Sequence, residues 1–399
     1  MMNHSPLNKK VKEAIEAVYP QVVAIRRHLH MYPELSNHEH DTAALVYRQV
    51  KEWGLKPRYH IGKTGVTADL GIGKGKTIVL RADMDALPIQ EKNRVAYKSQ
   101  VNGVMHACGH DIHTACLLGA AKILASLKKE LHGKVVFLFQ PSEEVEPGGA
   151  IQMIRSGAFP GNVDAVFGLH VSIDHPTGTI GLKPGDDCSG VLTFDVTVRG
   201  KGGHGAMPER AIDPIVCACS MIMELQTLIS RESPPFEPAV LTVGSFHSGT
   251  KRNIIPDEAR FYGTIRTFSE KLQTQLQRRV TQVLKAVAHS FRTGVEVSFV
   301  KSYPPGYNDP AMTGRAKDIL RDALGKSKVA VRSYPTMFAE DFTYYLKMSR
   351  GTYIHLGVKK PDDKAPAGLH SARFLPDETA MKTGIMTHCA LALGIAGKN

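Results

Sequence analysis

The sequence lacks any apolar segment long enough to cross a lipid bilayer. Residues 1–14 (MMNHSPLNKKVKEA) carry lysines, but no apolar segment follows them, so we expect no secretory signal. Cysteine is also scarce, and six thiols in 399 residues do not resemble a disulfide framework. These absences together predict a cytoplasmic protein in which most thiols serve as small core residues.

Basic residues outnumber acidic ones, but they are not concentrated in runs. The formal net charge is +12, from 50 lysines and arginines against 38 aspartates and glutamates. No basic run exceeds a few residues, and the sequence shows neither interleaved aromatic and basic residues nor a nucleic-acid-binding motif. We therefore expect neither nucleic acid nor membrane as a partner, and interpret the charge as a solvated surface that attracts anionic small molecules.

Hydrophobic periodicity in the first 186 residues alternates between strand and helix patterns. Short apolar runs such as KVVFLFQ predict buried strands, and apolar residues spaced three and four apart predict helices. The expected strands span residues 76–86, 134–140 and 164–171, and the expected helices span residues 9–30, 42–53, 113–130 and 148–157. Strands that alternate with helices predict the α/β class with a largely parallel sheet.

From residue 187 onward the pattern changes. Residues 191–200 (VLTFDVTVRG) alternate apolar and polar side chains, which is typical of a strand with one exposed face. The following elements are a helix at 213–230, strands at 239–247 and 259–266, a helix at 270–290 and a strand at 295–302. This β-α-β-β-α-β order predicts a ferredoxin-like α+β domain.

Beyond residue 300 the α/β pattern resumes. The expected elements are helices near 310–324, 339–348 and 377–395 and a strand at 352–358. The simplest interpretation is a discontinuous α/β domain, residues 1–186 and 300–399, into which a smaller domain, residues 187–299, is inserted.

The stretch MHACGHDIH, residues 105–113, places three histidines, a thiol and a carboxylate within nine residues. Three interpretations compete at this point: a metal site, a cysteine nucleophile with a histidine base, or a polar loop without special chemistry. One local cluster does not decide between them, so the positions of other possible ligands matter.

Further metal-binding residue types follow the neighbouring strands. Two adjacent glutamates come directly after the strand at 134–140, a histidine ends the strand at 164–171, and another histidine lies in AGLHSARF. Because the carboxyl ends of parallel strands form one edge of a sheet, we expect the side chains there to converge. Thiolate, imidazole and carboxylate groups bind zinc and similar metals, which favours a metal site. The candidates are Cys108, His110, Glu143, Glu144, His170 and His370.

Glu143 and Glu144 are consecutive, so their side chains point in different directions. One of them can bind metal while the other faces the substrate as a general base. Two ions that share a water would generate a nucleophile near neutral pH and polarise a carbonyl. A thiol–imidazole pair of Cys108 with His110 or His113 is less favoured, because residues two apart seldom make the required side-chain contact. It would also leave the glutamates and the other histidines unexplained.

The chain resembles the two-metal amidohydrolases of the aminoacylase/carboxypeptidase superfamily in the motifs MHACGHD, FQPSEE, GLHV, GGHGAMPE, NIIPDEARFYGTIRTF, AEDF and GLHS. It is most similar to the branch of hippurate hydrolases and indole-acetyl-amino-acid hydrolases, and the resemblance covers nearly the whole chain. The resemblance implies two divalent metal ions per chain (Zn, Mn, Co or Ni) and Glu143 as the general base. The ligands that it implies are Cys108, His110, Glu144, His170 and His370.

Two positions matter for how closely the chain follows that superfamily. In RADMDAL, Asp83 occupies the position where other branches have a histidine, while Asp85 is retained. This departure matches the branch in which a cysteine takes a ligand role. Asp85 is then expected to orient one of the ligands without binding the metal itself. Ala372 stands where the family commonly has proline, so the loop after His370 is expected to differ.

The inserted domain carries three further candidates, each of which also has an ordinary structural interpretation. The resemblance implies that His204, otherwise a turn histidine, stabilises the tetrahedral oxyanion, often across a dimer. It also implies that Asn253 and Arg266 bind the substrate carbonyl and carboxylate, where a turn asparagine and a strand-surface arginine are the alternatives. The domain would then act as a lid and as the dimerisation domain of a homodimer or higher homo-oligomer. The apolar stripe of residues 213–230 is a candidate surface for pairing two subunits, although packing within one chain equally explains it.

The sequence thus predicts a metal-dependent amidohydrolase that cleaves the amide bond of small-molecule N-acyl-amino acids with a metal-activated water and Glu143 as base. A dipeptidase on the same machinery is one alternative, and it would need a free α-amino group on its substrate. A catalytically silent metal-bearing binding protein is another. Glu143 argues against the silent protein, because a binding role needs no base beside the metals.

Overall fold

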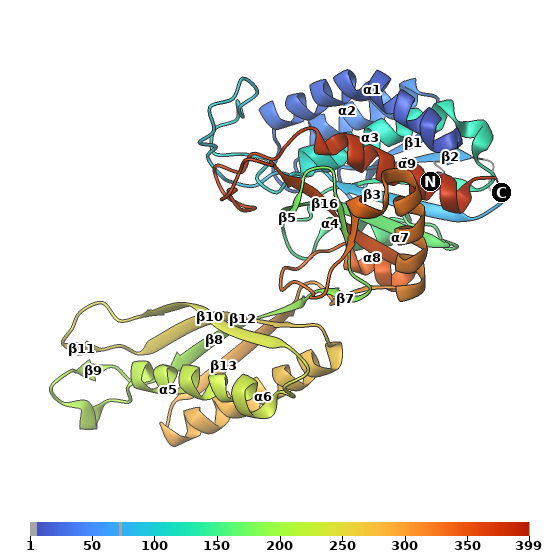
Figure 1. Cartoon of the computed structure of the whole chain (residues 1–399). Coiled ribbons are helices and arrows are strands. Elements are labelled where there is room, and N and C mark those ends of the chain that lie inside the picture. Colours follow the sequence, from blue (N-terminus) through green and yellow to red (C-terminus); the bar gives the residue numbers. More distant parts are fainter. Residues whose placement is uncertain (1–5, 72–73, 399) are drawn as a thin grey trace. The chain divides into compact units, whose positions relative to one another are not determined.

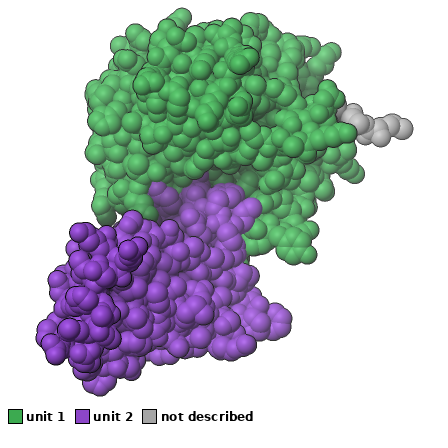
Figure 2. Space-filling view, turned by 90° about the vertical axis from the view of Figure 1, so that its left-hand side faces the viewer, with its two compact units in different colours: residues 1–187, 307–335, 341–399 green, residues 188–306, 336–340 purple. Residues whose placement is uncertain are grey.

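The computed structural model of the chain describes residues 6–71 and 74–398. The chain divides into two units, which Figure 2 shows in different colours. The first, here called the α/β unit, comprises residues 1–187, 307–335 and 341–399, and the second, the inserted unit, comprises residues 188–306 and 336–340. Residues 1–5, the start of the segment in which no secretory signal is expected, lie outside the described residues.

The α/β unit is built around an eight-stranded sheet with the strand order β1-β2-β4-β3-β5-β16-β6-β15 (Figure 1). The strands span Lys56–Ile61 (β1), Gly65–Gly71 (β2), Thr77–Asp83 (β3), Lys134–Gln140 (β4), Ala165–Pro176 (β5), Ile180–Leu182 (β6), Val329–Val331 (β15) and Gly351–Lys359 (β16). Neighbouring strands are parallel from β4 through β3 and β5 to β16, and also between β6 and β15. The pairs β1–β2, β2–β4 and β6–β16 are antiparallel. The prediction of an α/β protein with a largely parallel sheet is therefore confirmed.

Helices cover both faces of this sheet. They span Pro6–Met31 (α1), His40–Glu52 (α2), His110–Ser126 (α3), Gly149–Arg155 (α4), Pro310–Leu324 (α7), Thr343–Met348 (α8) and Ala380–Ala396 (α9). Successive residues of β3 belong to different cores, because Ile78 and Leu80 pack with α1, α2, α3, α7 and α9, whereas Val79 packs with α4 and α8. A strand covered on both faces is almost continuously apolar, which is why β3, β4 and β5 could be recognised in the sequence.

Some elements differ from the sequence pattern. The hairpin of β1 and β2 at one edge of the sheet was not expected, since β1 alternates exposed and half-buried residues instead of forming an apolar run. Helix α3 begins at His110, three residues before its predicted start, and α8 begins at Thr343, four residues after its predicted start. The later start of α8 leaves Asp341 ahead of the helix, where its buried carboxylate accepts a hydrogen bond from Arg81 at 2.9 Å.

The inserted unit contains a four-stranded antiparallel sheet with the strand order β10-β12-β8-β13. Its strands span Gly190–Arg199 (β8), Ala239–Ser248 (β10), Glu258–Thr267 (β12) and Gly294–Lys301 (β13), and its helices span Pro214–Thr227 (α5) and Glu270–Ser290 (α6). The order along the chain is β8-α5-β10-β12-α6-β13, and both helices pack on the same face of the sheet (Figure 1). The buried apolar residues of this unit form a cluster of their own, separate from the two clusters of the α/β unit.

The short segment Thr336–Glu340 belongs to the inserted unit although it follows β15 in the chain. The backbone N–H of Ser189 donates to Phe338 O at 3.0 Å, and the hydroxyl of Ser189 donates to Met337 O at 2.9 Å. Two pairs of short strands complete the fold: β7 (Gly185–Cys188) pairs with β14 (Gly306–Asn308), and β9 (Gly203–His204) pairs with β11 (Ile254–Ile255).

All six cysteines are free thiols, and five of them are buried, with Cys219 as the exposed one. This agrees with their interpretation as small core residues, while the cytoplasmic location stays a prediction. Within residues 6–71 and 74–398, no helix combines the length and the hydropathy that crossing a membrane requires.

Candidate metal centre

The loop before α3 brings Cys108 and His110 beside His170 and Val171, which lie in the middle of β5 and not at its end as the sequence pattern predicted. Gly109, which lies between them, caps the N-terminus of α3 with a φ of 85°, a conformation that residues with a side chain rarely adopt. A Cβ atom at this position would also lie only 2.5 Å from Val171 Cγ2. Glycine is therefore required both for the turn and for its close approach to β5.

Cys108, His110 and His170 form a first group of possible metal ligands. Their ligand atoms all lie within 4.8 Å of one another, and Cys108 Sγ is 3.3 Å from His170 Nε2. His110 donates from Nδ1 to the backbone oxygen of Asp85 at 2.8 Å, and His170 donates from Nδ1 to that of Val171 at 2.7 Å. Because a carbonyl oxygen can only accept, each ring in its neutral form keeps a lone pair on Nε2, which is the form that binds a metal.

Cys108 also belongs to a second group, together with Glu144 and His370. Glu144 Oε1 lies 3.2 Å from His370 Nε2. The backbone N–H of His370 donates to Ala107 O at 2.9 Å, so the loop that carries His370 is fastened to the residue before Cys108. The structure thus brings all five expected ligands together, in two groups that share one thiol.

Asp85 contacts one residue of each of these two groups, His110 and Glu144. One carboxylate oxygen is 3.2 Å from His110 Nδ1, and the other accepts a hydrogen bond from the backbone N–H of Glu144 at 3.0 Å. Glu143, next to Glu144, is buried and forms a third group with His110 and Glu144. Asp85 is therefore in a position to orient the His110 ring and to anchor the backbone of the two glutamates.

Glu39, which the sequence analysis did not single out, holds the same loop from another side. Its buried carboxylate accepts hydrogen bonds from the backbone N–H of Ser142 at 2.8 Å, that of Asn37 at 3.1 Å and the Thr64 hydroxyl at 2.6 Å. Ser142 has a φ of 56°, which is uncommon for a residue with a side chain. Glu39 therefore stabilises an unusual backbone conformation directly before Glu143.

The charges around the centre favour a cation. Burial lowers the pKa of His110, but the nearby carboxylates, led by Asp83, outweigh it and raise the pKa to about 10. Burial also raises the pKa of the Cys108 thiol well above its ordinary value, and the carboxylate of Glu144 adds to this effect. A divalent cation beside the thiol would oppose both effects and favour the thiolate, which is the form that binds metal.

The residues present fit a metal centre. His110 Nε2 is buried without a hydrogen-bond partner, and carboxylate oxygens of Asp83 and Glu144 lie 3.8 and 3.9 Å away. A buried polar atom without a partner is unfavourable, and a metal ion would remove that cost. A donor set of thiol, imidazole and carboxylate suits zinc and the neighbouring first-row metals.

The shared thiol leads to a test of the ligand set. Cys108→Ala should lower the amount of metal bound per chain, because both groups lose a ligand. Elemental analysis after dialysis against Mn²⁺ or Zn²⁺ measures this amount. Cys116→Ala is the matched control, since Cys116 is a buried thiol of α3 outside every ligand group, and it should keep the parent's metal content. An unchanged metal content in Cys108→Ala together with lost activity would contradict the ligand role and favour a nucleophilic thiol.

In the inserted unit, the structure brings His204 and Asn253 together. His204 in β9 pairs with Ile254 in β11, and the N–H of Gly205 donates to Asn253 O at 2.9 Å. The exposed ring of His204 accepts a hydrogen bond at Nδ1 from the N–H of Ala206 at 3.1 Å. In its neutral form this ring therefore carries its hydrogen on Nε2, where it can donate to a ligand.

Arg266 lies in the same unit but is not brought beside His204. It is eight residues beyond the start of β12 at Glu258, which corresponds to roughly 25 Å along an extended strand. Its guanidinium donates to Met337 O at 2.9 Å, and burial lowers its pKa. Asn253, the candidate for binding the substrate carbonyl, and Arg266, the candidate for binding the substrate carboxylate, thus lie near opposite ends of β12 within one chain.

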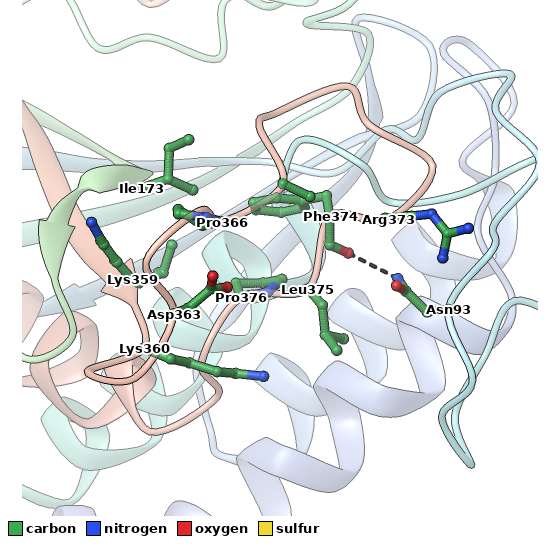
Figure 3. Close-up of a pocket in the computed structure, with 12 residues that line it drawn as sticks. Asn93, Ile173, Lys359, Lys360, Asp363, Pro366, Arg373, Phe374, Leu375 and Pro376 are labelled. Carbon is green, nitrogen blue, oxygen red and sulfur yellow. Dashed lines mark hydrogen bonds between the residues drawn. The ribbon is translucent and has the colours of Figure 1, made fainter.

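A cavity of about 190 Å³ lies beside the loop that carries His370 (Figure 3). Its walls include Ile173 of β5 and Phe374, and Asn93 Nδ2 donates to Phe374 O at 3.0 Å, the dashed line in Figure 3. The N–H of Lys92 donates to Ala372 O at 2.8 Å. These bonds fasten the loop to residues 92–93, and none of the five expected ligands lines the cavity.

Residues 79–394 match the family described as peptidase family M20/M25/M40. The chain is 42% identical over 363 residues to N-acetyl-L-cysteine deacetylase of Bacillus subtilis (strain 168), covering 90% of this chain and 85% of that protein. It is 38% identical over 375 residues to IAA-amino acid hydrolase ILR1-like 4 of Arabidopsis thaliana, covering 93% of this chain and 84% of that protein. The crystal structure of the YxeP protein of Bacillus subtilis, described as a dinuclear metal binding peptidase, superposes with a TM-score of 0.82 at 32% identity, covering 96% of this chain and 99% of that one.

The fold, the ligand groups and these similarities define a hydrolase of amide bonds. The chain belongs to peptidase family M20/M25/M40, whose match covers most of its length. The resemblance to two-metal amidohydrolases that the motifs indicated is therefore confirmed.

Proposed function

We propose that this chain hydrolyses the amide bond of N-acyl-amino acids, with two divalent metal ions held by Cys108, His110, Glu144, His170 and His370. The observation that carries the proposal is the pair of ligand groups that share Cys108, with Glu143 directly beside them. The relatives named as an N-acetyl-L-cysteine deacetylase and an IAA-amino acid hydrolase support acylated amino acids as the substrate class.

The bound ions would polarise the amide carbonyl and lower the pKa of water, which is the chemistry that Zn, Mn, Co or Ni supplies in such a centre. Glu143 belongs to neither of the groups that contain Cys108. Its carboxylate would therefore act as the general base, accepting a proton from the attacking water and delivering it to the leaving amine. One carboxylate that serves as base and then as acid needs no second titrating group.

The inserted unit would act as a lid and as a dimerisation domain. The Nε2 hydrogen of His204 would donate to the oxyanion, Asn253 would contact the substrate carbonyl, and Arg266 would bind the substrate carboxylate. Because Arg266 lies roughly 25 Å along β12 from Glu258, and His204 belongs to the separate β9–β11 pair that precedes this strand, one chain is not expected to present both to one small molecule. This separation supports a homodimer in which each substrate meets His204 of one protomer and Arg266 of the other.

A substrate panel tests the proposed function. The purified protein is stripped with a chelator, reloaded with Mn²⁺, Zn²⁺, Co²⁺ or Ni²⁺, and assayed for free amine released from N-acyl-amino acids and from dipeptides. We expect turnover of N-acyl-amino acids that chelation abolishes and a metal restores. Faster turnover of dipeptides with a free α-amino group would indicate a dipeptidase instead. Metal binding without turnover of either class would indicate a silent binding protein.

A further inference from the structure

Asp83, at the end of β3, has both carboxylate oxygens engaged by buried side chains. Oδ1 accepts a hydrogen bond from His113 Nδ1 at 2.6 Å, and Oδ2 accepts one from Arg81. Arg81 is itself held by Gln140 Oε1 at 2.9 Å and by the carboxylate of Asp341 at 2.9 Å. The carboxylate of Asp83 is therefore fixed between a buried guanidinium and the His113 ring.

The other ring nitrogen of His113 is also engaged. Its Nε2 accepts a hydrogen bond from the backbone N–H of Val171 at 2.9 Å. A backbone N–H can only donate, so Nε2 carries no hydrogen and the ring hydrogen lies on Nδ1, facing Asp83. Although Asp83, His110 and His113 have ligand atoms within 4.8 Å of one another, this geometry leaves His113 no lone pair for a metal.

Val171 connects this chain of contacts to the metal centre. The pairing of β3 with β5 ends at Gly168, and beyond that point His113 supplies the acceptor for the Val171 N–H. The carbonyl of Val171 accepts from His170 Nδ1 at 2.7 Å, and His170 Nε2 faces Cys108 Sγ at 3.3 Å. A shift of the Val171 backbone would therefore turn or displace the His170 ring.

We propose that Asp83 and His113 are positioning residues that fix the His170 ring for metal binding, and that Asp83 is not itself a ligand. The proposal rests on the proposed function in one respect, namely that His170 binds metal. It gives a role to His113, the third histidine of MHACGHDIH. The His113 ring fixes the backbone next to the expected ligand His170 and does not itself bind an ion. It also explains how an aspartate is accommodated at position 83, where it pairs with Arg81 and His113.

Cobalt binding to the apoprotein tests this proposal without relying on activity. Co²⁺ is titrated into the chelator-stripped chain, and its thiolate charge-transfer absorption and its affinity in competition with a chelator are recorded. His113→Phe keeps an aromatic ring but removes both hydrogen bonds. We expect the Co²⁺ affinity to fall by about 10–100-fold, as is typical when a residue that orients a metal ligand is replaced. His113→Gln keeps an acceptor for the Val171 N–H and should recover part of the affinity.

Thr114→Val is the matched control. Thr114 neighbours His113 on α3, is equally buried, and donates to the backbone oxygen of Asp83 at 2.7 Å and not to its carboxylate. We expect the Thr114→Val protein to bind Co²⁺ with the parent's affinity and spectrum, even if its melting temperature falls. An equal loss of affinity in the Thr114 and His113 variants would overturn the proposal in favour of general packing at the end of β3. A folded His113→Phe protein with the parent's affinity would overturn it as well.

Two further variants keep the outcome decisive. If His113→Phe does not fold, Asp83→Asn preserves the size of the side chain but turns a donor toward either His113 or Arg81, and it should weaken Co²⁺ binding to a similar extent. Unchanged binding in that variant would overturn the proposal. His170→Ala separates this proposal from the ligand assignment. If His170→Ala binds Co²⁺ like the parent, His170 is not a ligand and the proposed function fails at this point. If His170→Ala loses Co²⁺ affinity while the His113 and Asp83 variants bind Co²⁺ normally, the positioning role alone fails.

Discussion

The Glu143→Gln variant should keep its metal ions and lose turnover by roughly 10²–10⁴-fold or more, because an amide cannot accept the proton of the attacking water. Glutamine has nearly the same size as glutamate, so the anchoring of this loop by Asp85 and Glu39 should persist. The kcat for an N-acyl-amino acid and the metal content by elemental analysis are the two measurements.

The control for this variant is Glu146→Gln, which makes the same chemical change at an exposed position of the same segment. It should retain the parent's kcat and metal content. Near-normal turnover in metal-loaded Glu143→Gln would remove Glu143 as the base. Loss of metal in Glu143→Gln would instead point to a ligand role for this residue, in line with its proximity to His110 and Glu144.

The second large effect is expected at His204. A preorganised donor to an oxyanion typically contributes about 2.7–4 kcal/mol to the transition state, so His204→Ala should lower kcat by roughly 10²–10³-fold. Metal content and folding should be unchanged, because the inserted unit contains none of the expected ligands. His289→Ala, at an exposed histidine of α6, is the control that should leave kcat unaltered.

Subunit mixing tests whether His204 acts across a dimer. Inactive His204→Ala and inactive Glu143→Gln chains, once exchanged, should form heterodimers in which one site holds an intact Glu143 and an intact His204. Recovery of part of the activity supports action in trans. Verified exchange without recovery would assign His204 to its own chain's site, and full activity of His204→Ala alone would exclude it from the mechanism.

The parts of the fold that the sequence revealed are those with a local signal. Strands β3, β4 and β5 appear as short apolar runs because most of their residues are buried. Polar residues follow β3 and β4 directly, whereas His170 lies within β5, just beyond the point where its pairing with β3 ends. That regularity made it possible to expect Cys108, Glu144 and His170 in one place, although they are up to 62 residues apart in the chain. Nothing comparable marked β1, whose residues alternate between exposed and half-buried at the edge of the sheet.

The supporting residues of the site could not be predicted in the same way. Glu39 interacts with Asn37, Thr64 and Ser142, which come from three separate segments, so no spacing in the sequence connects them. His113 was visible in the sequence, but its role depends on meeting the N–H of Val171, at a point where the pairing of two strands has just ended. Such contacts follow from the packed fold and not from any local pattern.

The separate hydrophobic cores of the two units should be visible in a calorimeter. The inserted unit buries one cluster of apolar side chains and the α/β unit buries two others, so heating should produce one cooperative transition for each unit. All five expected ligands lie in the α/β unit, and an ion that binds only the folded form stabilises it by about 2.7 kcal/mol when its concentration is 100 times its Kd. Adding a chelator should therefore move one heat-absorption peak to lower temperature and leave the other in place. A single peak that shifts as a whole would mean that the two units unfold as one.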